Sequence, residues 1–304
     1  MKKMKKIMAA AIAMMTFSTA AAVTGTVAWF TASNVVSASG MSIQADTEQG
    51  LLIANETYTS PSDWAASATA SHNGEITVDS ETKQAAFIPT STFDASEWYH
   101  ANSTNFDNAE ANQASAKYAG FTFGDTTELG VNGSSTGVYQ IKKGELAITN
   151  KNIFLLNSFF LKSSTIENLS ANKLYVNEVN ATAPETPASA ALNKSLRVLV
   201  TCSYGNTLYK AFFAPFEASG ELATYKVGGV EGQTYTPYES GKKDVELVTT
   251  ALEIPGSNTT TPLEVKVYVY FEGEDANCKS ANIQATLDKI SLDVKFGTQK
   301  IVNN

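Results

Sequence analysis

The feature that most constrains this chain is a two-residue alternation of apolar and polar side chains, which recurs along most of its length. The clearest example, at 263–272, places five apolar side chains on one face: Leu263, Val265, Val267, Val269 and Phe271. This period is typical of a half-buried β-strand. Turn signals separate the alternating stretches, and no helical stretches alternate with them as in a parallel α/β sheet. The pattern predicts an all-β fold, an antiparallel β-sandwich.

Two regions of the expected sandwich differ in regularity. In the regular second half, we expect Val267 and Val269 in a central strand and Leu292 and Val294 in another strand of the same sandwich. The region at about 55–135 is polar and turn-rich, which predicts a loop-rich insertion. Inside it, an Asn-Gly turn at 73–74 ahead of an alternating stretch predicts a hairpin. The stretch 94–118 fits either a short helix or an insertion loop.

The first 28 residues have the organisation of a secretory signal peptide. A head with four lysines precedes an uncharged apolar run at 7–22, and the small residue Ala28 follows Val27 at the expected cleavage point. Cleavage by signal peptidase between Ala28 and Trp29 leaves 276 of the 304 residues. A mature chain of this length is sufficient for one large sandwich or two modest domains, and it needs no disulfide or metal to supply a core.

The expected mature N-terminus combines an aromatic pair with a short strand. In order, it contains an aromatic pair, a Ser-Gly turn and three alternating apolar residues: Trp29-Phe30, Ser39-Gly40, and Met41, Ile43 and Ala45. With the lysine-rich signal, this arrangement resembles the TasA/camelysin family of secreted, fibre-forming proteins from Gram-positive bacteria. The resemblance covers about the first fifty residues. It implies a jelly-roll β-sandwich that polymerises when the N-terminal segment of one subunit completes the sheet of a neighbour.

This resemblance implies a division of the chain and a set of partners. We expect a signal peptide at 1–28, a donor segment with the first strand at 29–46, and a sandwich domain with its insertion at 47–304. The residues expected to mediate polymerisation are Trp29, Phe30, Met41 and Ile43. The main partner would be another copy of the chain in a head-to-tail homopolymer, with a minor or anchoring matrix protein as a further partner. The expected location is extracellular, at the bacterial cell surface.

Charge and hydropathy argue against other kinds of partner. Removal of the signal takes four lysines and no acidic residue, so the formal net charge falls from −8 to −12. An acidic excess of this size repels phosphate backbones and anionic lipid, which disfavours nucleic-acid binding. A second apolar span of about 18 residues does not follow the signal, so we expect no membrane span in the mature form.

The residues that common enzyme sites require are sparse in this sequence. The histidines are His72 and His100, which lie in different polar contexts without the spacing of a zinc hydrolase. Neither a Gly-x-Ser-x-Gly elbow nor a glycine-rich phosphate loop ending in Lys-Ser/Thr is present. We therefore expect a protein that is not an enzyme and that has no catalytic residues, cofactor or metal.

Two loops have compositions that also suit ligands. The acidic stretch 272–278 has carboxylates and an amide that could surround calcium, but a solvated turn closing a hairpin is the preferred interpretation. Asp63-Trp64 and the stretch 97–100 place aromatic rings beside acids, as sugar-binding loops do. Tryptophans that cover a secondary core under the insertion are the preferred alternative there. The second functional hypothesis is a secreted, non-catalytic binding module for a carbohydrate or protein ligand.

The two cysteines leave two alternatives open. Cys202 lies on the apolar face of its expected strand, and Cys278 lies in the loop after the most regular strand. In an exported protein they could form a disulfide that removes about 4 kcal/mol of unfolded-state freedom. Otherwise they are a small core residue and an exposed loop thiol.

Overall fold

The computed structural model describes eight stretches of the chain, together with the backbone of six short strands. These stretches are 41–47, 50–71, 90–100, 154–183, 192–218, 222–227, 232–278 and 290–301. The expected cleavage site at Ala28, the aromatic pair Trp29 and Phe30, and His72 lie outside the described residues. Among the described residues, no helix is long and apolar enough to cross a membrane.

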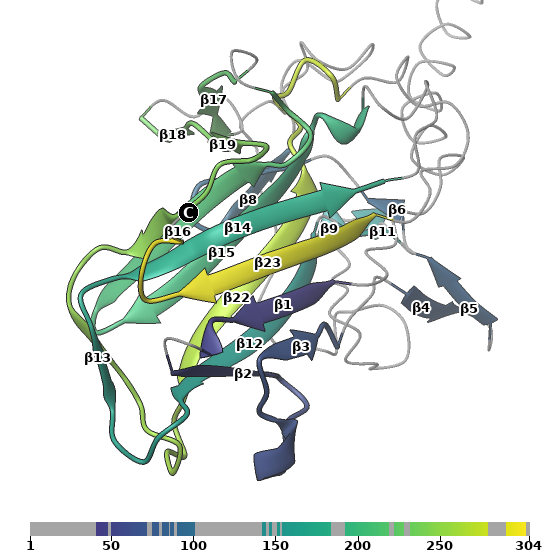
Figure 1. Ribbon diagram of the computed structural model, residues 1–304. Helices are drawn as coiled ribbons and strands as arrows, with labels where there is room; N and C mark the ends of the chain where they lie inside the picture. Colours follow the sequence, from purple (N-terminus) through teal and green to yellow (C-terminus); the bar gives the residue numbers. More distant parts are fainter. Residues whose placement is uncertain are drawn as a thin grey trace, which may run out of the picture.

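Two sheets form the body of the molecule (Figure 1). The five-stranded sheet has the order β20 (Val245–Val248), β14 (Leu174–Thr182), β23 (Ser291–Gly297), β1 (Ser42–Ala45) and β3 (Ser67–Thr69). The six-stranded sheet has the order β19 (Tyr238–Glu239), β16 (Thr207–Ala214), β15 (Leu196–Tyr204), β22 (Leu263–Phe271), β12 (Leu155–Ser163) and β2 (Leu51–Asn55). Most pairs are antiparallel, and the parallel ones are β1 with β23 and β16 with β19.

The main hydrophobic core lies between these two sheets, and the alternation in the sequence predicted its members. Val267 and Val269 are buried on β22, which is an interior strand of the six-stranded sheet. Leu292 and Val294 are buried on β23 of the opposite sheet and belong to the same core. The predicted all-β sandwich is therefore confirmed, because each alternating strand turns its apolar set toward the other sheet.

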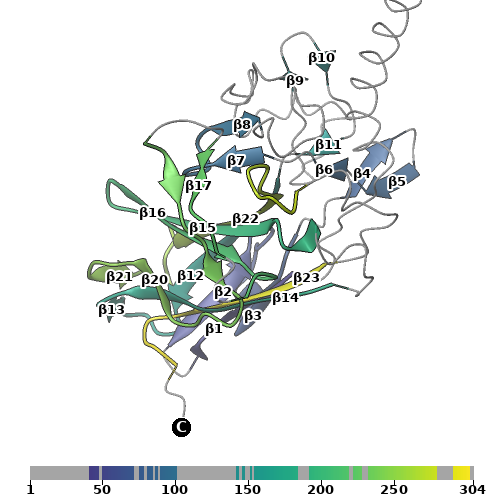
Figure 2. The same ribbon diagram turned by 90° about the horizontal axis from the view of Figure 1, so that it is seen from above.

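A second core covers the outer face of the six-stranded sheet, where the pattern of a half-buried strand predicts solvent. Tyr268 and Tyr270, on the face of β22 opposite the main core, are buried there beside Trp98. Two hairpins form this third layer: β7 (Thr90–Thr92) with β8 (Trp98–His100), and β17 (Tyr225–Lys226) with β18 (Thr234–Tyr235). Figure 2 shows β7, β8 and β17 on the side of the six-stranded sheet away from β14 and β23.

The remaining elements are short. They are η2 (Pro61–Asp63), β4 (Glu75–Val78), β5 (Glu81–Gln84), β6 (Ala86–Phe87), β9 (Lys142–Lys143), β10 (Leu146–Ala147), β11 (Lys151–Asn152), β13 (Leu169–Ala171) and β21 (Leu252–Ile254). The strand expected after the Asn-Gly pair at 73–74 is β4, but its hairpin partner is β5, which follows it. The start of the ambiguous stretch 94–118 belongs to the β7–β8 hairpin, and 101–118 lie outside the described residues.

Candidate assembly site at the N-terminal strand

The N-terminal strand β1 lies inside the five-stranded sheet of its own subunit. It pairs in parallel with the last strand, so that Ile43 faces Val294, and it pairs antiparallel with β3. Met41 and Ile43 are fully buried in the main core. These two residues, which we expected in the polymerisation segment, thus form part of the subunit's own core.

Hydrogen bonds hold both ends of β1 in this position. The amide of Ala70 donates to the carbonyl of Met41 at 2.9 Å, and the amide of Asp46 donates to the carbonyl of Phe296 at 3.1 Å. On the outer face, the Ser42 hydroxyl donates to Asp293 at 2.8 Å. The chain upstream of Met41 is therefore attached to the fold at a fixed point between β3 and β23.

A tight turn connects β1 to β2 in the other sheet. The amide of Leu51 donates to the Asp46 carbonyl at 3.2 Å, and Gly50 closes the turn with a φ of +78°. This left-handed conformation favours glycine because a β-carbon would be strained there. The turn leaves few residues between the two sheets, so β1 cannot move far from β2 unless the turn opens.

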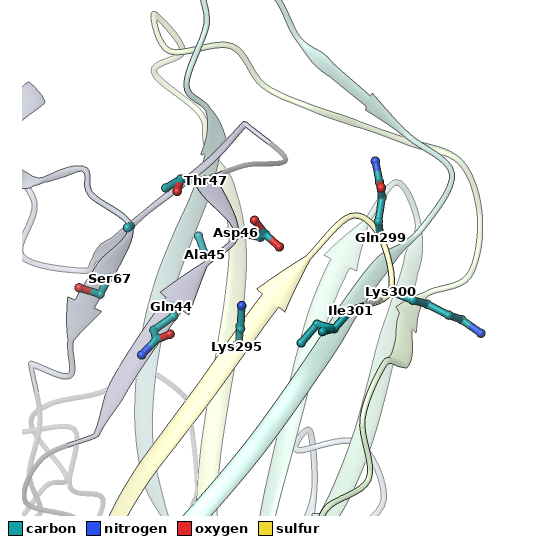
Figure 3. Close-up of a pocket in the computed structure, with 10 residues that line it drawn as sticks. Gln44, Ala45, Asp46, Thr47, Ser67, Lys295, Gln299, Lys300 and Ile301 are labelled. Carbon is teal, nitrogen blue, oxygen red and sulfur yellow. The ribbon is translucent and has the colours of Figure 1, made fainter. Parts of the chain in front are cut away.

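A polar hollow of about 740 Å³ opens at the turn end of β1 (Figure 3). It is lined by residues from β1, β3, β23 and the C-terminal stretch: Gln44, Ala45, Asp46, Thr47, Ala66, Ser67, Lys295, Gln299, Lys300 and Ile301. The charged residues that line it are Asp46, Lys295 and Lys300, so the hollow carries charges of both signs.

The two sides of the sandwich differ in how their edges are covered. On the β2–β3 side, Ile53 and Ala65 exchange backbone hydrogen bonds at 2.9 and 3.1 Å, which connects the edge strand β2 to the chain that leads into β3. On the other side, β19 pairs with β16 only at Phe213 and Ala214. Among the described residues, no further strand pairs with the first half of β16.

Exposed apolar side chains mark the same open edge. The described residues contain three large apolar side chains that are exposed, namely Ile166, Leu208 and Tyr238. Leu208, 43 % exposed, lies on β16, and Tyr238, 38 % exposed, lies on β19. An edge strand with unpaired backbone groups and apolar side chains can accept another strand.

A buried cluster of ionisable residues lies on the outer face of the six-stranded sheet, around Arg197 near the start of β15. The Nη2 atom of Arg197 donates to Asp275 at 2.6 Å and lies 3.3 Å from a carboxylate oxygen of Glu217. The hydroxyl of Tyr225 donates to Asp275 at 3.0 Å, and the Arg197 guanidinium stacks over the Tyr225 ring at 4.8 Å. All four side chains are almost completely buried.

A second carboxylate of the acidic loop, Glu272, is also turned inward. The hydroxyls of Ser91 and Tyr235 donate to it, and the amide of Glu274 donates to it at 3.0 Å. Burial raises the pKa of Glu272, against the opposing effect of these donors. The loop 272–278 is therefore not the solvated turn that we preferred, because the carboxylates of Glu272 and Asp275 are buried and accept hydrogen bonds from buried partners.

This cluster fits neither a metal site nor an open catalytic site. Among the described residues, no group of three or more histidine, cysteine, aspartate or glutamate side chains could hold a metal ion. The Asp275 carboxylate, which the calcium alternative would need, is already bonded to Arg197, Tyr225 and the Asn277 amide. The role of the whole cluster in the fold is to connect the third layer to the sheet.

The aromatic residues that the sequence suggested as sugar contacts lie in two different environments, one in the core and one near the surface. Trp98 and Tyr99 are buried in the second core, as the preferred interpretation expected. Trp64 is half-buried, with its ring 5.1 Å from that of Tyr58 and beneath the Lys162 ammonium at 4.0 Å. Because the two tryptophans lie in different environments, they do not form one sugar-binding platform.

The structure does not bring the two cysteines together. Both thiols are free and buried, so Cys278 is not the exposed loop thiol that one alternative expected. Cys278 interacts with Ser195 at the start of β15, whereas Cys202 lies seven residues further along that strand. That separation is about 23 Å at about 3.3 Å per residue, beyond the reach of a disulfide.

Comparison with protein-family models, curated proteins and solved structures finds no match for this chain.

Proposed function

We propose that this chain is a secreted structural subunit of an extracellular fibre or matrix assembly, which polymerises by N-terminal strand addition. The observation that carries the proposal is the burial of Met41 and Ile43 between β3 and β23. This anchor assigns them a different role from the one expected at first. They anchor the C-terminal end of the donor segment in their own subunit, and the segment 29–40 upstream of them extends to a neighbouring subunit.

The order of the strands supports a jelly-roll form of the sandwich. Without β1, β2 and the two-residue strand β19, the eight remaining strands of the two sheets in chain order are β3, β12, β14, β15, β16, β20, β22 and β23. Numbered one to eight, they lie as 6-3-8-1 in one sheet and 5-4-7-2 in the other. This is the order of two Greek keys in an eight-stranded jelly roll. In this arrangement β1 is an added strand, inserted where the first and last strands would otherwise pair.

The lengths of the connections favour the upstream segment over β1 itself as the donor. If β1 moved into a neighbour, the five steps from Asp46 to Leu51 would span at most about 18 Å. Because this connection is short, the two subunits would have to meet at the end of the sandwich that carries the turn, and a contact between identical ends favours a closed dimer. The twelve residues at 29–40 can span about 40 Å and start at the other end of β1. A donor there permits a head-to-tail chain that does not close.

The open edge formed by β16 and β19 is the proposed acceptor. Its exposed Leu208 and Tyr238 offer apolar contacts to an incoming strand, and the first half of β16 offers backbone groups. Val35-Val36 at the centre of the donor segment, with polar residues on either side, suits an edge of this kind. The aromatic pair at the free end adds large apolar surface that burial against a neighbour would stabilise.

Two variants of the mature chain test this function. Deletion of 29–38 should leave a folded monomer with an unchanged β-type circular dichroism spectrum, and electron microscopy should show no filaments. A chain with Ser42→Cys and Asp293→Cys, whose native side chains are 2.8 Å apart, should form a disulfide that fixes β1 in its own subunit. If 29–40 is the donor, this fixed variant still forms filaments.

The outcomes distinguish the alternatives. If the disulfide abolishes filaments and reduction restores them, β1 itself is exchanged. If the complete mature chain remains monomeric over a wide range of concentration and pH, the fibre function is wrong, and a secreted binding module becomes the better hypothesis. At the acceptor, Leu208→Lys should prevent filament growth, whereas Ile166→Lys, at a residue that is 71 % exposed and lies outside both sheets, should not.

A further inference from the structure

The second hairpin of the third layer is fixed to the sheet by both aromatic and ionic contacts. We call the described residues of this hairpin and its flanks, 217–218, 222–227 and 232–239, the cap, which ends with β19 at the edge of the sheet. The Tyr235 ring stacks on Phe212 of β16 at 4.1 Å, and the Val227 amide donates to the Gln233 carbonyl at 2.9 Å. Glu217 lies at the start of the cap, and its buried carboxyl faces Arg197 of the sheet. The ionic part of the attachment therefore depends on the charge of Glu217.

The carboxyl groups around Arg197 outnumber the single positive charge of its guanidinium. One guanidinium faces the carboxyl groups of Asp275 and Glu217, and Glu272 adds a third carboxyl to the same buried region. The same nitrogen, Nη2, serves both near partners, at 2.6 Å for Asp275 and at 3.3 Å for Glu217. The Oε2 atom of Glu217 is buried and accepts no hydrogen bond there. Asp275 is thus the better-paired acid, and an ionised Glu217 would be an excess buried negative charge.

We propose that Glu217 is a proton-operated latch for the cap. As a neutral acid it holds the cap closed on the sheet, and as a carboxylate it loosens the cap. The geometry favours this direction, because Arg197 and Asp275 already form a close pair. An ionised Glu217 beside them has one long hydrogen bond, from the Tyr225 hydroxyl to Oε1 at 3.4 Å, and its buried Oε2 accepts none.

Three ionisable groups act on Glu217 directly: Arg197 on β15, Asp275 in the acidic loop and Tyr225 in the cap. Four more lie around Arg197 in the same buried region, namely Glu272 in the acidic loop, Tyr235 in the cap, Tyr270 on β22, and Cys278. Burial raises the pKa of Glu217 to about 7 from its ordinary 4.5, and Asp275 adds to this, although Arg197 opposes it. Burial also raises the pKa of all three tyrosines and of the thiol, so they stay neutral in the relevant range.

The sign of the pH effect follows from this raised pKa. Between about pH 4.5 and 7 the closed cap retains a proton that the open cap releases, so the closed form loses stability as the pH rises through this window. Above about pH 7 the closed form loses no further stability, and the equilibrium between closed and open cap no longer depends on pH. The equilibrium between open and closed cap should shift toward opening by on the order of a hundredfold across the window.

Hydrogen exchange of the cap tests the latch in the complete mature chain. The protection factors of amides at 222–227 and 232–239, corrected for intrinsic exchange rates, should fall as the pH is raised from 5 to 8. Glu217→Gln copies the neutral acid, so it should give high protection that does not change with pH. Glu239→Gln, a half-exposed acid in the same cap, is the matched control and should keep the full pH response.

A second measurement on the unmodified protein covers the case in which Glu217→Gln does not fold. The infrared carbonyl band of a protonated carboxyl should persist in the folded protein at pH 6 and disappear with a midpoint near pH 7. Protection that is independent of pH in the unmodified chain, or a Glu217→Gln variant that retains the pH response, would overturn the latch. The absence of a carboxyl band at pH 6 would overturn it as well.

Discussion

Replacing Trp98 with alanine removes the central side chain of the second core. The indole is 2 % exposed, stacks on Phe154 at 4.3 Å and meets the edge of Tyr270 at 5.3 Å. Its Nε1 donates to the carbonyl of Ala95 at 3.2 Å. Loss of a buried indole costs about 3–5 kcal/mol, within which each aromatic pair accounts for about 1 kcal/mol. The third layer should therefore contribute a large share of the stability of the whole chain.

Thermal unfolding of the mature chain measures this cost, with Trp64→Ala as the matched control. In a chain of this size 1 kcal/mol shifts Tm by about 2 °C, so Trp98→Ala should lower Tm by about 6–10 °C. Trp64 is only half-buried, and its loss should lower Tm by less than about 3 °C. Equal shifts for the two variants would refute the assignment of Trp98 to a core that stabilises the sheet.

Four further outcomes test the fold and the processing of the chain. Val267→Asp places an unpaired carboxylate between the two sheets and should destabilise the fold by several kcal/mol in denaturant unfolding. Arg197→Met leaves buried carboxylates without their cation and should cost about 3–5 kcal/mol by the same assay. Cys202, whose pKa burial raises to about 12, and Cys278 should resist alkylation in the native protein, and both should react after unfolding without reductant. N-terminal sequencing of exported protein should begin directly after Ala28; an intact chain would contradict the signal peptide.

The sequence predicted the main core well because alternation reports directly which side chains face inward. Strands β22 and β23 were predicted with the correct buried face, since their apolar residues occupy every second position. The pattern of a half-buried strand does not hold for the opposite face of β22, where Tyr268 and Tyr270 are buried under the third layer. Two large aromatic rings on that face are the sequence signal for a further covering layer.

The buried charges could not be predicted from local sequence. Arg197 occupies a position that alternation assigns to the outer face, and its partner Asp275 is 78 residues away in the chain. A charged side chain is buried only where distant segments supply its counter-charge, and spacing within one segment does not contain that information. The useful signal was the density of acids at 272–278, which exceeded what a short hairpin turn requires.

The position of β1 beside β23 has a consequence for how the chain reaches its final structure. Ser42 and Asp293 are separated by 251 residues, so β1 finds its parallel neighbour only after all the residues between them have been synthesised. Pairs with such long sequence separation form slowly, because a long loop must close before any contact offsets the lost chain entropy. Until then Met41 and Ile43 remain uncovered on an incomplete sheet. The order of synthesis therefore leaves a period in which the growing chain can associate with other chains before its own last strand arrives.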